Sequence, residues 1–283
     1  MRALATIGTW GAGAWAAGTL FGPSWTPAGD APPAGTLELA GDDRAVLPWA
    51  SVTKLCSALA VLVAVEEGTV ALAEPAGPAG STVAHLLSHA SGLGPGTPVP
   101  LAPPGARRIY SNAGFEVLAD HVAVRSGIPF ADYVDEAVCR PLGMTGTRWR
   151  PGRSPAHGLT GTARDLMALG AELRAPTLVH PSTLDRATRV AFPGLAGVLP
   201  GFGRHDPCDW GLGFELRDGK HPHWTGSGNS PRTFGHFGRS GCFLWVDPDR
   251  GVVLGVLTDR PFGPWAAAAW PLLSDAVLAE VAA

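Results

Sequence analysis

Charge in general, and lysine and tyrosine in particular, are scarce in this chain of 283 residues. Only 16% of the residues are charged while 46% are hydrophobic, and the formal net charge is -3. The 21 basic residues are nearly all arginines scattered along the chain, so no basic segment is available to bind nucleic acid. The composition predicts a globular protein with a large buried core and no nucleic-acid partner.

Long apolar runs and paired cysteines are also missing. The longest apolar run, residues 55–65, is shorter than the roughly 18 residues that a membrane span requires. The four cysteines form no C-x-x-C and have no zinc-type spacing, so we expect free thiols, no metal and no organic cofactor. Cys56, inside the apolar run, is expected to be a small core residue.

The first 21 residues have some features of a signal peptide, with one arginine followed by small and apolar residues. Glycines interrupt this run, and no convincing cleavage site follows it. Removing it would also leave too few strands for the first long helix to pack on. We therefore predict a cytoplasmic protein, and secretion is the less favoured alternative.

The chain has only two lysines, Lys54 and Lys220, and the first lies three residues after Ser51. We expect Ser51 to be the N-cap of a buried helix, which would bring the Lys54 amine within reach of the serine hydroxyl. A guanidinium cannot lose its proton in a protein, whereas a buried ammonium can. A lysine here, in a chain that otherwise uses arginine, favours proton transfer to and from a serine nucleophile. The structural alternative is a serine that only caps the helix and a lysine that extends from its edge to solvent.

The remaining pattern predicts strands at both ends of the chain and helices between them. Residues 14–20 and 35–40 are expected to form a hairpin joined by a Pro/Gly-rich link at residues 22–33. A short helix capped by Ser81 carries His85 and His89, which lack a third metal ligand and are interpreted as structural. The segment at residues 104–115 is expected to be a loop leading into a helix that runs to about residue 126, and further helices are expected at residues 51–67, 130–139, 162–174, 181–190 and 264–281. Strands are expected at residues 211–216, 232–238, 242–246 and 252–258.

This order of elements predicts an α/β (α+β) fold in two parts. Residues 1–49 and 205–283 are expected to form an antiparallel sheet flanked by helices. Residues 50–204 are expected to form a mainly helical domain inserted into it. A functional site would then lie at the junction of the two domains.

Several short motifs follow one another in an order that resembles a known family. S-V-T-K begins at Ser51, Y-S-N at Tyr110 and H-F-G at His236, with the spacers L-L-S-H-A-S-G-L at residues 86–93 and P-L-G-M-T-G-T at residues 141–147. Together they resemble the serine β-lactamase and penicillin-binding-protein superfamily, in its class C-like branch of esterases and D,D-peptidases. The similarity extends over about residues 45–260. It implies the β-lactamase/D,D-peptidase-like fold.

The resemblance implies a role for each motif residue. Ser51 would attack an acyl carbonyl, and Lys54 and Tyr110 would share the proton, with either of them as the general base. The backbone N–H groups of Ser51 and Arg239, the residue after Gly238, would form the oxyanion hole. Asn112 would hydrogen-bond a carbonyl of the substrate.

The H-F-G motif departs from the K-T-G or H-T-G of the family. Phe237 has no hydroxyl to bind a substrate carboxylate, although a protonated His236 could still pair with one. We therefore expect a small neutral ester, amide or lactone as substrate. The alternatives are a biosynthetic transacylase, a β-lactamase or D,D-carboxypeptidase, and a non-catalytic penicillin-binding-type sensor.

Overall fold

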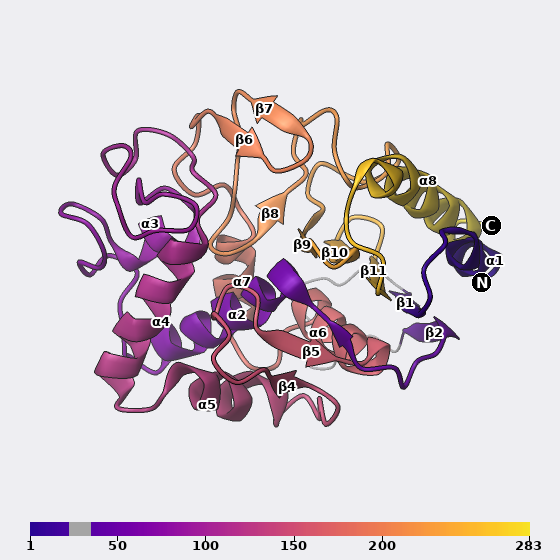
Figure 1. Ribbon diagram of the computed structural model, residues 1–283, viewed down its shortest axis with the longest axis horizontal. Helices are drawn as coiled ribbons and strands as arrows, with labels where there is room; N and C mark the ends of the chain where they lie inside the picture. Colours follow the sequence, from indigo (N-terminus) through magenta and orange to yellow (C-terminus); the bar gives the residue numbers. More distant parts are fainter. Residues whose placement is uncertain (23–34) are drawn as a thin grey trace.

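The computed structural model describes residues 1–22 and 35–283 and contains a six-stranded sheet. Most strands of this sheet lie in the right half of Figure 1. All neighbouring strands in this sheet are antiparallel. In spatial order they are β2 (Thr36–Gly41), β1 (Trp15–Phe21), β11 (Val252–Thr258), β10 (Cys242–Asp247), β9 (Phe234–Gly238) and β8 (Glu215–Leu216). The first strands of the chain thus pair with its last ones, as predicted. The predicted link at residues 22–33 lies outside the described residues, apart from Gly22.

The central strands are buried on both faces, which explains their nearly continuous hydrophobic sequence. In β10, Phe243 and Trp245 face one hydrophobic cluster, while Leu244 and Val246 face another. The first cluster is shared with α1 (Arg2–Ala5), the 3-10 turn η1 (Thr6–Thr9) and α8 (Pro264–Val281). The second contains the helices of the central part of the chain.

Helix α6 (Ala163–Arg174) lies directly against the sheet, on β11, β1 and β10. The approach is close because the helix presents Gly170, where a Cβ would lie 2.6 Å from Val253 Cγ1. The helix begins at a capping box formed by Thr162 and Asp165, as the T-x-x-D sequence allows. The predicted division of the chain into residues 50–204 and the remainder stays a prediction. Helix α6 belongs to residues 50–204 in sequence but packs on the sheet.

The remaining helices surround one buried helix, α2 (Thr53–Glu66), which is largely apolar on all sides. Around it lie α3 (Val83–Leu87), α4 (Asn112–Ser126), α5 (Phe130–Val134) with the π-helical turn η3 (Asp135–Cys139), and α7 (Pro181–Ala187). Two small sheets complete the fold, one of β3 (Leu47–Pro48), β5 (Leu159–Gly161) and β4 (Arg148–Trp149), the other of β6 (Gly197–Leu199) and β7 (Gly203–His205).

Three local predictions are wrong. Ser51 is not the N-cap of α2 but lies within a 3-10 turn, η2 (Ala50–Val52), which precedes the helix. Thr82, not Ser81, caps α3, because its hydroxyl accepts a hydrogen bond from the backbone of His85. The predicted strand 211–216 is reduced to β8, since its first residues form a turn around Gly213, whose φ is 91°.

All four cysteines lie within the described residues and are free, as predicted. All are buried, which was predicted for Cys56 alone. Over residues 1–22 and 35–283, no helix is long and apolar enough to cross a membrane. Within the same residues, no group of three or more His, Cys, Asp or Glu side chains is placed to hold a metal ion.

Candidate active site

The turn that carries Ser51 is held against the sheet on its N-terminal side. Cys242 Sγ donates to the Trp49 carbonyl at 2.9 Å, and Ser240 Oγ donates to the Pro48 carbonyl at 2.8 Å. Ala50 has a φ of 41°, a conformation that costs a non-glycine residue about 1–3 kcal/mol and persists only where the surroundings impose it. The backbone immediately before the serine is therefore fixed in an unfavourable conformation.

Lys54 is fully buried one turn beyond Ser51. Its Nζ lies 3.5 Å from Ser51 Oγ and donates to Asn112 Oδ1 at 2.7 Å and to the Ala156 carbonyl at 3.0 Å. In the described part of the chain these partners are all neutral. Burial lowers the pKa of Lys54 well below its usual value, and the charge of Glu116 opposes this effect only in part. The site thus favours a neutral amine beside the serine hydroxyl.

The segment that carries Tyr110 is held by its neighbours in the Y-S-N motif. Ser111 is the N-cap of α4, and its Oγ accepts from Gly114 N–H at 2.9 Å while donating to the Gly94 carbonyl at 2.6 Å. The backbone N–H of Ser111 donates to His89 Nδ1 at 3.1 Å. His89 is buried and adopts a φ of 58°. This histidine, interpreted from sequence as structural, therefore anchors the tyrosine segment.

The ring of Tyr110 lies between the lysine and an aromatic wall. Lys54 Nζ is 4.8 Å from the centre of the Tyr110 ring, and the rings of His89 and Trp210 lie at 4.6 and 5.8 Å. Burial raises the pKa of Tyr110 well above its usual value, although a hydrogen bond with Ser51 opposes the rise. The phenol therefore stays protonated near neutral pH, while the neighbouring lysine is the group that readily gives up its proton.

Strand β9 forms the other side of the site. A Cβ on Gly238 would lie 2.9 Å from both Ala50 Cβ and the Trp49 carbonyl oxygen, so this strand end touches the serine turn. His236 is buried, its ring centre is 5.8 Å from that of Tyr110, and its Nδ1 is 2.7 Å from the Phe237 carbonyl. Arg239 follows as an exposed residue whose carbonyl accepts from Phe262 N–H at 2.9 Å.

Two features of β9 bear on a substrate carboxylate. Burial lowers the pKa of His236 to about 3, so the ring is neutral near pH 7 in the free protein. Phe237 points to the opposite face of the sheet, where it packs among Phe202, Trp224, Phe262 and Trp270. In the free protein, β9 thus offers a substrate carboxylate neither a hydroxyl at residue 237 nor a charged imidazole at residue 236, and the pairing of a protonated His236 with a carboxylate stays a prediction.

The fold thus brings the residues of S-V-T-K, Y-S-N and H-F-G together from three distant parts of the chain. The sequence reasoning missed Trp210 and the Ala156 carbonyl, which no sequence pattern marks. It interpreted His89 as structural but did not foresee its contact with the Y-S-N segment.

The chain belongs to the Beta-lactamase family, whose model matches residues 39–278. This match confirms the family resemblance predicted from the motifs, and the fold shared with a solved structure titled a beta-lactamase confirms the predicted fold class.

A crystal structure from Mycobacterium bovis, titled a beta-lactamase, is 51% identical to this chain, covers 99% of both chains and has a TM-score of 0.91. An Escherichia coli (strain K12) protein named "Putative D-alanyl-D-alanine carboxypeptidase" is 27% identical over 207 residues, which cover 57% of this chain and 47% of that protein. The chain spans about half the length of the curated relatives of this kind that it matches. Simvastatin synthase from Aspergillus terreus, 16% identical over 98% of this chain and 93% of that one, shares the fold with a TM-score of 0.75.

Proposed function

We propose that the protein is a serine hydrolase that forms an acyl-enzyme on Ser51 and cleaves an ester or amide. The observation that carries the proposal is the environment of Lys54, a fully buried amine whose hydrogen-bond partners in the described residues are neutral and which lies 3.5 Å from Ser51 Oγ. Such a lysine has no evident structural purpose, because a buried ammonium without a carboxylate partner is costly. It suits a general base.

In the proposed reaction, Lys54 takes the proton of Ser51 as Oγ attacks the acyl carbonyl. The bond from the carbonyl carbon to the leaving oxygen or nitrogen breaks, and the proton passes through the Tyr110 hydroxyl to the leaving group. Water then attacks the acyl-enzyme, gives up a proton along the same path and restores Ser51. The raised pKa of Tyr110 favours a hydroxyl that relays protons over a tyrosinate that acts as the base.

Charge that develops on the carbonyl oxygen would be stabilised by the backbone N–H groups of Ser51 and Arg239. The contact between Gly238 and Ala50 supports this pairing, since it brings the two backbone segments together. One such donor typically contributes about 3–4 kcal/mol to the transition state. Ser51 also precedes the N-terminus of α2, where the helix dipole favours negative charge.

A neutral ester, amide or lactone is supported as the substrate by two observations: His236 is neutral, and Phe237 points away from the site into the aromatic cluster with Trp270. A second candidate is the hydrolysis of a β-lactam or of a D-alanyl-D-alanine peptide. The names of the M. bovis and E. coli relatives favour it. It would require the substrate carboxylate to be bound without a hydroxyl on residue 237.

The test combines labelling with turnover. Wild type, Ser51→Ala and the control Ser227→Ala are incubated with a fluorophosphonate probe, and intact mass is measured. Ser227 is a suitable control because it pairs with Asp275 on the surface. We expect one adduct on wild type and control and none on Ser51→Ala, with hydrolysis of p-nitrophenyl esters following the same pattern.

Each other outcome has a defined meaning. Absence of an adduct on wild type, or turnover of every tested ester and amide by Ser51→Ala, would contradict the proposal. Rapid cleavage of nitrocefin would favour the second candidate. Acyl transfer to added amines or alcohols in preference to water would identify a transacylase.

A further inference from the structure

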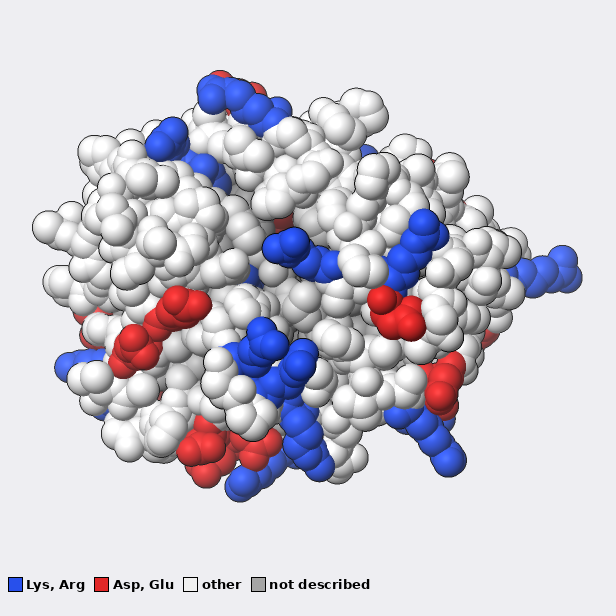
Figure 2. Space-filling view, viewed as in Figure 1, with Lys and Arg blue, Asp and Glu red and all other residues white. Residues whose placement is uncertain are grey.

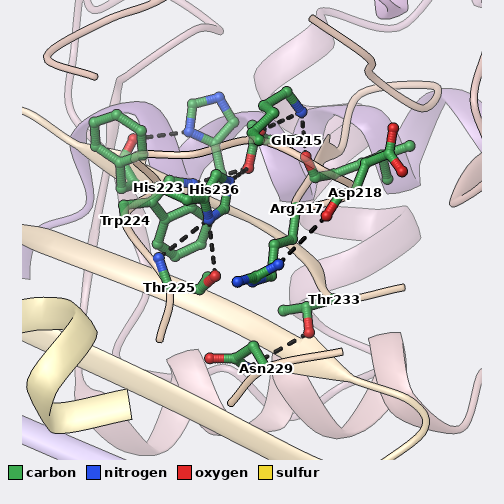
Figure 3. A network of polar contacts seen from close by, with 12 residues as sticks. Glu215, Arg217, Asp218, His223, Trp224, Thr225, Asn229, Thr233 and His236 are labelled. Carbon is green, nitrogen blue, oxygen red and sulfur yellow. Dashed lines mark hydrogen bonds and ion pairs between the residues drawn. The ribbon is translucent and has the colours of Figure 1, made fainter. Parts of the chain in front are cut away.

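The second lysine of the chain, Lys220, is buried and forms an ion pair with Glu215. Figure 3 shows Glu215 with its neighbours His223 and Trp224. Its Nζ is 2.8 Å from Glu215 Oε1 and donates to the Asp209 carbonyl at 2.6 Å and also to the Leu216 carbonyl. Three acceptors around one ammonium satisfy its three hydrogens. A planar guanidinium could not reproduce this arrangement, which explains why lysine is found here in an arginine-rich chain.

The other oxygen of Glu215 completes the cluster. Oε2 accepts from Trp224 Nε1 at 2.8 Å and lies 2.9 Å from His223 Nε2. His223 Nδ1 accepts from Thr225 N–H at 3.2 Å, so the ring hydrogen is on Nε2 and points to Glu215. One carboxylate and one ammonium thus compensate each other, and the neutral imidazole and the indole supply the remaining hydrogen bonds.

The cluster holds together the segments that form the wall of the site. Trp210 pairs with Glu215 as an isolated β-bridge, and Glu215 pairs with Gly235 of β9, next to His236. The Trp210 ring centre lies 5.8 Å from that of Tyr110 and 5.6 Å from that of His236. A chain of contacts therefore runs from Glu215 through Trp210 and Tyr110 to Lys54.

We infer that Glu215 and Lys220 are positioning residues: through Trp210 and β9 they set the position of Tyr110 and His236 against the Ser51–Lys54 pair. This rests on the proposed function only for its kinetic consequences. The structural coupling can be measured without any substrate.

The first experiment uses the scarcity of lysine. With carbon-13 at Cε of lysine, the folded protein gives two lysine side-chain signals, and Lys220→Met assigns them because only Lys54 remains. We expect Glu215→Gln to shift the signal of Lys54 as well as that of Lys220. The matched control is Glu172→Gln, another buried carboxylate, which accepts from Thr177 and Leu178 in a segment remote in sequence from the cluster. It should leave both signals in place.

The second experiment separates positioning from folding. Glu215→Gln leaves Lys220 buried without its charge partner and should lower the melting temperature. The double variant Glu215→Leu/Lys220→Met buries no charge and should regain much of that loss. Its kcat for a p-nitrophenyl ester should nevertheless stay about tenfold to a hundredfold below wild type with KM changed little, because a small displacement of catalytic groups costs that much.

Two results would overturn the inference. One is a Lys54 signal that stays unchanged in Glu215→Gln and in Glu215→Leu/Lys220→Met. The other is a double variant with the kcat of wild type. Either result would mean that the Glu215–Lys220 cluster stabilises the fold but does not position the catalytic residues. Failure of the proposed function has a different signature, because wild type itself would then hydrolyse no ester while the two lysine signals still respond together to Glu215→Gln.

Discussion

Replacing Lys54 by methionine should change how the stability of the protein depends on pH. Methionine is an unbranched side chain that resembles the apolar stem of lysine, so the packing of residue 54 in α2 is preserved. The Asn112 amide oxygen and the Ala156 carbonyl lose their donor, a cost of about 1–3 kcal/mol that does not vary with pH. Catalysis should be lost with the base, by a factor of about 10²–10⁴.

The pH dependence follows from the lowered pKa of Lys54. The unfolded lysine titrates near 10.5, whereas the buried one titrates well below this value. Between the two pKa values the unfolded chain holds a proton that the folded chain lacks, so the stability of wild type rises with pH by about 1.4 kcal/mol per unit. Lys54→Met has no such group. The stability of wild type relative to the variant should therefore increase with pH over the interval between the lowered folded pKa of Lys54 and about pH 10.

Urea denaturation of wild type, Lys54→Met and Ser51→Ala at closely spaced pH values between 6 and 10 measures this difference. Ser51→Ala keeps the lysine and should follow the slope of wild type. Parallel curves for wild type and Lys54→Met would show that Lys54 titrates alike in the folded and unfolded chains. The argument for a neutral lysine base would then fail.

Three further changes test other parts of the structure. Tyr110→Phe should lower kcat for esters by about 10²–10⁴ with little change in melting temperature, because it removes only the proton relay; an unchanged kcat would mean that the proton takes another path. Phe237→Thr should destabilise the protein by about 3–5 kcal/mol without raising nitrocefin turnover, since the new hydroxyl would lie in the aromatic cluster around Trp270; faster turnover would show that residue 237 can face the site. Gly170→Ala should lower the unfolding free energy by about 1–3 kcal/mol despite the better helix propensity of alanine, because its Cβ would lie 2.6 Å from Val253 Cγ1; Gly96→Ala, in open space, is the control, and equal melting temperatures would contradict the close approach of α6.

The parts of the fold that follow from periodicity were predictable from sequence. The largely apolar α2, the two-sided burial of β10 and β11 and the opening hairpin all appear where hydrophobic patterns place them. The residues at which helices begin were harder to predict from sequence. Ser51 and Ser81 resemble N-caps, yet the actual boundaries at Thr53 and Val83 depend on a 3-10 turn and on the neighbouring Thr82.

Within the candidate site, the motif residues could be recognised from sequence, but their electrostatics could not. The state of Lys54 depends on complete burial and on a carbonyl at Ala156, supplied by a loop with no recognisable signature. The state of Tyr110 depends on how far the folded chain shields its hydroxyl from water. The position of the Trp210 ring beside His89 and Tyr110 also depends on long-range packing, which sequence does not reveal. The φ of 41° at Ala50 arises from tertiary contacts that no local propensity encodes.

Both lysines of this protein are inside it, Lys54 beneath the serine turn and Lys220 within its ionic cluster. Amine-directed reagents such as succinimidyl esters should therefore leave the lysines of the folded protein unmodified, although the neutral amine of Lys54 is intrinsically nucleophilic. Each modified lysine would record a molecule that had opened, and the two lysines have different surroundings. The rate of acylation at each, read by peptide mass, would report local opening of the site separately from opening of the cluster.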